Sequence, residues 1–210
     1  MLCRALLLAA HRTFLRNLTL WLCVGAPLLC SLQGCEEEPG PLPVIAQVPA
    51  FELQDQRGAE VSAATLRGTV WVANFIFTSC PDICPLLTKK MNDLRTGLVR
   101  KGVDVRFVSF TVDPQTDTPQ VLHDYAEKHR ANHADWFFLT GSLERVKDVV
   151  VSGFKQVVER DSEQQDNILH GSHFVLVDRA LAVRGFYRSD ADGLLSLSQA
   201  AARLAQDSSP

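Results

Sequence analysis

The sequence has no excess of basic residues, which argues against a nucleic-acid-binding protein. Its 210 residues hold 21 lysines and arginines against 24 aspartates and glutamates. A domain that binds nucleic acid generally concentrates positive charge on one face. The chain also lacks internal repeats and low-complexity stretches, so one folded domain is the simplest expectation.

Acidic residues are absent from the first 35 positions, where the charged residues are three arginines: Arg4, Arg12 and Arg16. The nearly uncharged stretch Leu18–Leu32 is too short for a comfortable membrane span, which needs roughly 20 apolar residues. These features predict an export signal over residues 1–34, with an uncleaved anchor helix as the alternative. Removing that segment leaves 18 basic and 24 acidic side chains, a formal net charge of −6.

The predicted export signal ends in residues 32–35, Leu-Gln-Gly-Cys, which resemble a bacterial lipobox. The resemblance implies that Cys35 receives a diacylglyceryl group and becomes the new N-terminus. Residues 35–48 are acidic and proline-rich, a composition that stays extended and solvated, so we interpret them as a tether. The expected product is a membrane-anchored lipoprotein whose folded domain, residues 49–205, lies outside the cytoplasm, on the periplasmic side.

Hydrophobic patterning predicts alternating strands and helices in residues 49–205. Two apolar runs, 70–77 and 105–112, are typical of strands buried on both faces of a sheet, and the first should be central. The expected elements are strand 70–77, a helix through Leu87–Leu98, strand 105–112, a helix from Thr118, strand 136–139, a helix from Leu143, a hairpin of 174–177 with 182–187, and a helix over 194–205. This order predicts an α/β, thioredoxin-like fold: a central mixed sheet flanked by helices, with a C-terminal β-hairpin and helix.

Few cysteines remain once the export signal is removed: Cys35, Cys80 and Cys84. The last two lie between the first predicted strand and the helix after it, where open α/β sheets bind ligands and helix amides favour thiolate over thiol. A four-residue spacing brings two sulfurs to one helix face, although Pro81 and Pro85 predict an irregular loop with the regular helix starting near Pro85. A static disulfide is the alternative, but closing so short a loop restricts little chain entropy.

Three motifs resemble the Sco/SenC family, thioredoxin-like assembly proteins for cytochrome c oxidase. Residues 78–85, Thr-Ser-Cys-Pro-Asp-Ile-Cys-Pro, resemble the copper-binding loop of the family. Residues 112–119, Val-Asp-Pro-Gln-Thr-Asp-Thr-Pro, resemble a second family pattern, and His170 lies eight residues before Asp178, as the metal-binding histidine of the family does. Together the matches span about residues 49–205.

The resemblance implies a site for copper, as Cu(I) or Cu(II), with Cys80, Cys84 and His170 as ligands. It also implies a partner, cytochrome c oxidase subunit two, whose binuclear copper site would receive the ion. Two thiolates and an imidazole are soft ligands that suit Cu(I). The sequence departs from the family at Gly171, where Ser or Thr is usual. His173 is a rival ligand, which we expect at the start of the next strand.

Asp82 and Asp113 are candidates for a supporting role at the copper site, because carboxylates near thiols can tune a pKa or add a ligand. Each has a plainer interpretation. Asp82 could cap the helix through its free amides, and Asp113 could form, with Pro114, the turn that leaves a strand.

A thiol-disulfide oxidoreductase that keeps the oxidase cysteines reduced is the alternative function. Cys80 would be the nucleophile and Cys84 would resolve the mixed disulfide. Such enzymes characteristically carry a cis-proline before the strand facing their cysteines and usually separate those cysteines by two residues. Here three residues separate them, and no proline lies between Pro119 and Pro210. The pattern favours metal binding. Because metal binding needs the thiols reduced, it implies an external thiol reductant in an oxidising compartment.

Overall fold

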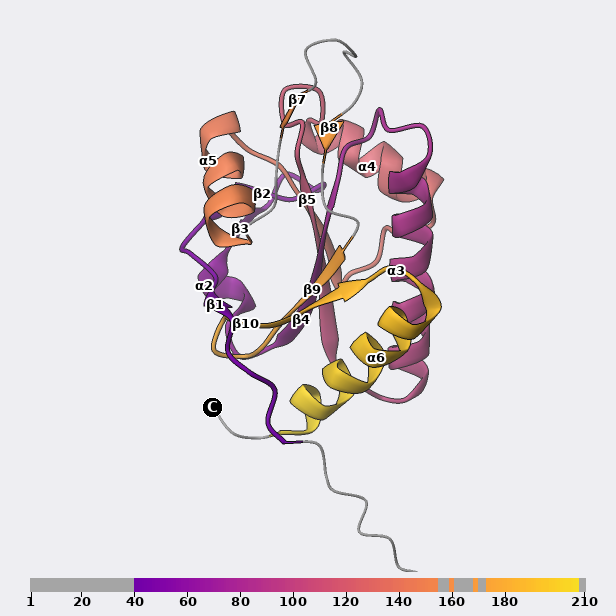
Figure 1. The fold of residues 1–210 in the computed structure, drawn as a ribbon. Coiled ribbons are helices and arrows are strands. Elements are labelled where there is room, and N and C mark those ends of the chain that lie inside the picture. Colours follow the sequence, from indigo (N-terminus) through magenta and orange to yellow (C-terminus); the bar gives the residue numbers. More distant parts are fainter. Residues whose placement is uncertain (1–39, 155–158, 161–167, 170–172, 208–210) are drawn as a thin grey trace, which may run out of the picture. The chain divides into compact units, whose positions relative to one another are not determined.

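Six strands form the central sheet in a computed structural model, which describes residues 40–207 apart from 155–158, 161–167 and 170–172 (Figure 1). In sheet order the strands are β1 (Ala46–Gln47), β10 (Ala182–Arg188), β9 (His173–Val177), β4 (Val70–Ile76), β5 (Val105–Thr111) and β6 (Trp136–Leu139). Strands β4, β5 and β6 run parallel, whereas β9, β10 and β1 join antiparallel. The mixed sheet confirms the predicted thioredoxin-like fold, and β4 is central as expected.

Strand β4 is buried at every residue, because helices cover both faces of the sheet. Successive side chains point to opposite faces. One face carries an aromatic cluster in which Phe75 stacks on Phe110 at a centroid distance of 6.0 Å and both contact Phe154. The other face places Asn74 opposite Ser109, whose hydroxyl donates to the Asn74 Oδ1 at 2.6 Å.

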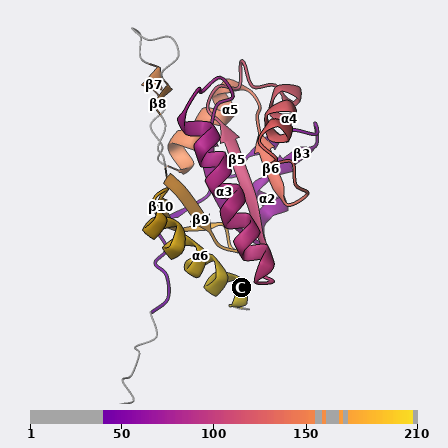
Figure 2. The ribbon, with the colours of Figure 1, turned by 90° about the vertical axis from the view of Figure 1, so that its right-hand side faces the viewer.

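Helices α3, α4 and α6 cover one side of the sheet, and α2 and α5 cover the other (Figures 1 and 2). Their bounds are α2 Ala63–Leu66, α3 Ile83–Arg100, α4 Pro119–Lys128, α5 Leu143–Lys147, which continues as the π-helix η1 Asp148–Gly153, and α6 Ala191–Gln206. Helix α3 buries the apolar stripe predicted for it: Leu87, Met91, Leu94 and Leu98. Within the described part of the chain, no helix has the length and apolar character needed to cross a membrane.

The starts of α3 and α6 differ from the sequence prediction by two or three residues, whereas α4 and α5 start as predicted. Helix α3 begins at Ile83, two residues before Pro85. Proline is tolerated there because amides of the first turn have no intrahelical partner. Helix α4 starts as predicted, with Pro119 at its first position and the Thr118 side chain accepting a hydrogen bond from the Val121 amide at 3.3 Å.

A short N-terminal hairpin, β2 (Glu52–Gln54) with β3 (Glu60–Ser62), was not predicted. The side chain of Gln56, in its turn, donates to the Trp136 carbonyl at 3.0 Å and accepts from the Phe138 amide at 2.9 Å. It therefore satisfies backbone groups on the outer edge of β6, which would otherwise be open. Strand β1 lies inside the segment 35–48 interpreted as a tether, so pairing with the sheet begins before residue 49.

The parallel strands β4 and β5 end at the same edge of the sheet. The Val112 amide donates to the Ile76 carbonyl at 2.8 Å, one step beyond the last ladder pair, Ile76 and Thr111. The loop 77–82 after β4 and the loop 112–118 after β5 therefore leave the sheet side by side. The candidate site is built from these two loops.

Candidate metal centre

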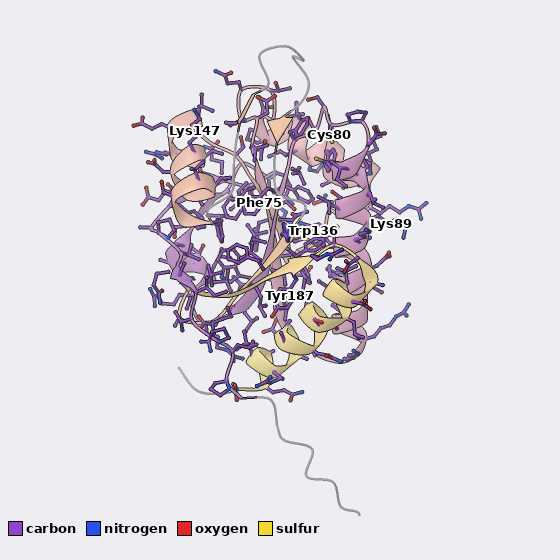
Figure 3. The ribbon with its side chains drawn as sticks, in the orientation of Figure 1. Phe75, Cys80, Lys89, Trp136, Lys147 and Tyr187 are labelled. Atoms are coloured by element: carbon purple, nitrogen blue, oxygen red, sulfur yellow. The ribbon has the colours of Figure 1, made fainter. Side chains whose placement is uncertain are left out.

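The cysteine pair lies where β4 gives way to α3. Figure 3 shows Cys80 beside the first turn of α3, with Lys89 farther along the same helix and pointing outward. Cys80 is 7% exposed and Cys84 is fully buried. Neither cysteine forms a disulfide within the part of the chain that the structure describes. The structure therefore brings the two predicted sulfur ligands to the ligand-binding edge of the sheet, with Cys80 the more accessible of the two.

The Cys80 sulfur is held against the first turn of α3. The Cys84 amide donates to Cys80 Sγ at 3.4 Å, and Cys84 is the second residue of a helix whose first amides lack partners. The sulfur thus accepts a hydrogen bond that a capping side chain would otherwise accept. Asp82 occupies the N-cap position but makes no side-chain cap hydrogen bond. The interpretation of Asp82 as the helix cap is wrong.

Burial raises the pKa of the Cys84 thiol, and this is the largest of several effects on it. Contact with the Phe77 backbone opposes the rise, whereas the hydrogen bond and charge of Cys80 and the charge of Asp117 add to it. A buried thiolate needs a positive partner. Cys84 is therefore a poor free nucleophile but a suitable ligand for a cation that replaces its proton.

A neutral hydrogen-bonded pair lies one helical turn beyond Cys84. The hydroxyls of Thr88 and Tyr125 are 2.9 Å apart, and both residues are buried. Burial raises the pKa of Tyr125, and the charges of Cys84 and Cys80 raise it further, which places the phenol near the thiols. The part of the site formed by Thr88 and Tyr125 is thus polar but uncharged.

A buried carboxylate, Asp117, ties the two loops of the site together, and sequence reasoning did not identify it. Asp117 is fully buried and accepts hydrogen bonds from the Thr78 amide at 3.1 Å, the Thr78 hydroxyl at 2.5 Å and the Thr111 hydroxyl at 2.5 Å. Burial raises its pKa, and these three donors oppose the rise. Asp117 lies inside the family-like run 112–119, but no local pattern shows that it faces a loop 39 residues away.

Asp113 is buried, and its charge contributes to the raised pKa of Asp117. Its amide donates to the Thr111 hydroxyl at 3.0 Å. Its carbonyl accepts from the amides of Thr116 and Asp117 at 3.1 and 2.9 Å. The backbone of Asp113 therefore forms the turn expected from the sequence.

His170, the predicted nitrogen ligand, lies outside the described residues, as do Gly171 and the predicted lipidation site Cys35. The backbone just before His170 is described: β8 (Ile168–Leu169) pairs antiparallel with β7 (Glu159–Arg160).

The rival ligand His173 is exposed at the first position of β9, as expected, where it pairs with Arg188. Among the described residues, no group of three or more His, Cys, Asp and Glu side chains is placed to hold a metal ion. The described part of the site thus supplies two thiols, and a third ligand would have to come from elsewhere.

Comparisons with known proteins agree with this architecture. The family model described as SCO1/SenC matches residues 43–205. The SCO1 protein homolog of Bacillus subtilis (strain 168) is 40% identical over 136 residues, which cover 64% of this chain and 70% of that protein.

Solved structures resemble the fold over most of its length. A SCO1/SenC family lipoprotein from Bacillus anthracis str. Ames superposes with a TM-score of 0.72 at 31% identity, covering 78% of this chain and 98% of that one. BsSco is a member of the Sco family of cytochrome c oxidase assembly proteins in which a disulfide switch was identified. It superposes with a TM-score of 0.67 at 35% identity, covering 77% of this chain and 96% of that one. Arabidopsis thaliana ScoI with copper bound superposes with a TM-score of 0.65 at 28% identity, covering 75% of this chain and 97% of that one. Because the family model matches well over half of the chain, this protein belongs to the SCO1/SenC family.

Proposed function

We propose that this protein is a membrane-tethered, extracytoplasmic copper chaperone. In this proposal it binds copper through Cys80, Cys84 and His170 and delivers it to the binuclear copper site of cytochrome c oxidase subunit two. The observation that carries the proposal is the buried pair Cys80 and Cys84, with the Cys80 sulfur held against the first turn of α3. Two relatives support it: ScoI with copper bound, and BsSco of the oxidase assembly family.

The environment of the thiols suits a soft cation. Thiolates select Cu(I) over harder ions, and copper binding would release the Cys84 proton that burial otherwise retains. His170 follows β8 directly in the sequence and would supply the imidazole. Two sulfurs and one nitrogen leave a coordination position through which a ligand of the partner can attack.

The difference in burial between the sulfurs gives the transfer a direction. Cys80 is partly exposed and Cys84 is fully buried. An incoming cysteine of the acceptor would therefore displace Cys80 first and Cys84 last. Each exchange replaces one copper–sulfur bond by another, so the ion is never released to water.

The proposed location rests on the N-terminal sequence. Export through residues 1–34 and lipid attachment at Cys35 would anchor the chain to a membrane on its periplasmic side. The sheet begins at Ala46, eleven positions after Cys35. An extended segment of that length reaches at most about 40 Å. The folded domain would then stay close to the membrane, where a membrane-bound oxidase presents its subunits.

Copper transfer to a purified oxidase copper-site domain tests the proposal. The copper-loaded soluble domain, residues 41–210, should deliver its ion to the acceptor and should reduce insulin-like disulfide substrates poorly. Cys80→Ser and Cys84→Ser should each abolish transfer, whereas His173→Ala should transfer like the wild type. Reduction of the disulfide substrate at thioredoxin-like rates with no copper transfer would reject the chaperone.

The same geometry favours one alternative, a thiol-disulfide oxidoreductase acting on the oxidase cysteines. Cys80 would attack, because it is the more accessible thiol and accepts a helix amide. Cys84 would resolve the mixed disulfide after giving up the proton that burial otherwise retains. The attack of Cys80 on the disulfide of the acceptor releases one acceptor thiol and forms a mixed disulfide. Cys84 then attacks the Cys80 sulfur, which releases the second acceptor thiol and leaves a Cys80–Cys84 disulfide. An external thiol reductant would then restore the dithiol.

A further inference from the structure

The buried Asp117 side chain is hydrogen-bonded to two segments of the chain. Its Oδ1 accepts from the Thr78 hydroxyl and its Oδ2 from the Thr111 hydroxyl, both at 2.5 Å, and the Thr78 amide donates to both oxygens at 3.1 and 3.3 Å. Thr78 stands two residues before Cys80 in the loop after β4, and Thr111 is the last residue of β5. One carboxylate thus joins the cysteine loop to the neighbouring strand.

The donors fit the ionised form of Asp117. The Thr78 amide can only donate, and the two hydroxyls are placed to donate as well. These hydrogen bonds favour the carboxylate and oppose the rise in the Asp117 pKa that burial causes. Hydrogen bonds to a charged group are roughly twice as strong as neutral ones. The Thr78 segment is therefore held by three donor contacts to a charge, in a place where water is excluded.

The charge of Asp117 acts on the thiols. Asp117 is hydrogen-bonded to Thr78, which lies two residues before Cys80, so the carboxylate is only a short loop away from the sulfur ligands. Two thiolates with Cu(II) carry no net charge, whereas two thiolates with Cu(I) carry one negative charge. A nearby buried carboxylate repels the second state more than the first.

We propose that Asp117 is a positioning residue that fixes the cysteine loop for metal binding and biases the centre toward Cu(II) over Cu(I). The proposal deepens the proposed copper function and rests on it. The mechanical part comes from the hydrogen bonds to Thr78, and the bias comes from the buried negative charge. Asp117 does not touch the metal in this scheme and acts through the loop that carries Cys80.

The test compares Asp117→Asn with two variants of the soluble domain, residues 41–210. Thr78→Val removes one donor and keeps the charge, whereas Asp124→Asn removes an exposed carboxylate of α4 that accepts from Gln120. Metal-free hydrogen exchange, followed by mass spectrometry, should show faster exchange in residues 77–82 for Asp117→Asn and Thr78→Val. Segments outside 77–82 and 111–118, the two segments that Asp117 joins, should be unchanged. Asp124→Asn should match the wild type throughout.

The midpoint potential of the copper-loaded domain distinguishes the effect of the Asp117 charge from the effect of the hydrogen bonds that hold the cysteine loop. In Asp117→Asn, Cu(I) should gain about tenfold in affinity relative to Cu(II), which raises the Cu(II)/Cu(I) potential by about 59 mV. Thr78→Val should weaken the binding of Cu(I) and of Cu(II) by a similar factor, and should therefore leave the midpoint potential unchanged. A potential in Asp117→Asn equal to that of the wild type, or unchanged local exchange in Thr78→Val, overturns the proposal. If the wild-type domain bound no copper, the proposed function would fail, and the exchange comparison would still decide the role of Asp117.

Discussion

The buried pair Thr88 and Tyr125 predicts a strongly non-additive pair of mutations next to the metal centre. Thr88 is fully buried, Tyr125 is 6% exposed, and their hydroxyls are 2.9 Å apart. Thr88→Val keeps the shape of the side chain but leaves the phenol without this partner. A buried polar group left unsatisfied costs about 1–3 kcal/mol. A domain of this size loses about 2–4 °C of Tm per kcal/mol, so the expected fall is about 2–12 °C.

The double variant Thr88→Val with Tyr125→Phe should be more stable than the sum of the single effects predicts. Removing both hydroxyls leaves no unsatisfied group, and replacing both partners by apolar groups can be nearly neutral. Urea unfolding of the reduced domain measures the three free energies of unfolding, and a double-mutant cycle gives the coupling. Additive losses, with unchanged m-values, would refute the claim that these hydroxyls satisfy each other.

Three further predictions concern the thiols and the tether. Because burial raises the pKa of Cys84, the folded protein keeps this proton where the unfolded chain has lost it. The free energy of unfolding of the reduced domain should therefore be fully retained at pH 7 and should fall above the ordinary thiol pKa of roughly 8.5. Urea unfolding at pH 7 and pH 9.5 checks this, and a profile that rises with pH would contradict it. Cys84→Ala should reduce the fall, leaving the part due to Tyr125, whose pKa is also raised. Cys35→Ser should leave an unlipidated, unprocessed precursor with an unaffected copper site, and intact masses showing the same unlipidated N-terminus in both proteins would refute lipidation.

The strands and helices of the core could be predicted from the sequence because their signals are local. The apolar run 70–77 gave the central strand β4, and the spacing of Leu87, Met91, Leu94 and Leu98 gave α3. The hairpin β2–β3 was missed because each of its strands is three residues long, too short to show a clear alternation of apolar and polar residues.

The site was predictable only in part, because some of its contacts join distant positions. The cysteine pair could be identified from spacing and from its place between a strand and a helix. Asp82 has the residue type of a helix cap, but in the structure Cys80 Sγ accepts the amide of Cys84 instead. Asp117 contacts Thr78 across 39 positions, and only the pairing of β4 with β5 brings them together.

Anaerobic copper titration of the reduced soluble domain, with thiol counting, tests the central claim most directly. The wild type should bind one copper per chain. Cys80→Ala and Cys84→Ala should each abolish tight binding, His170→Ala should weaken it, and His173→Ala should bind nearly as the wild type does. Unchanged stoichiometry in both cysteine variants would contradict the copper centre, and a weaker His173 variant beside a normal His170 variant would reassign the nitrogen ligand.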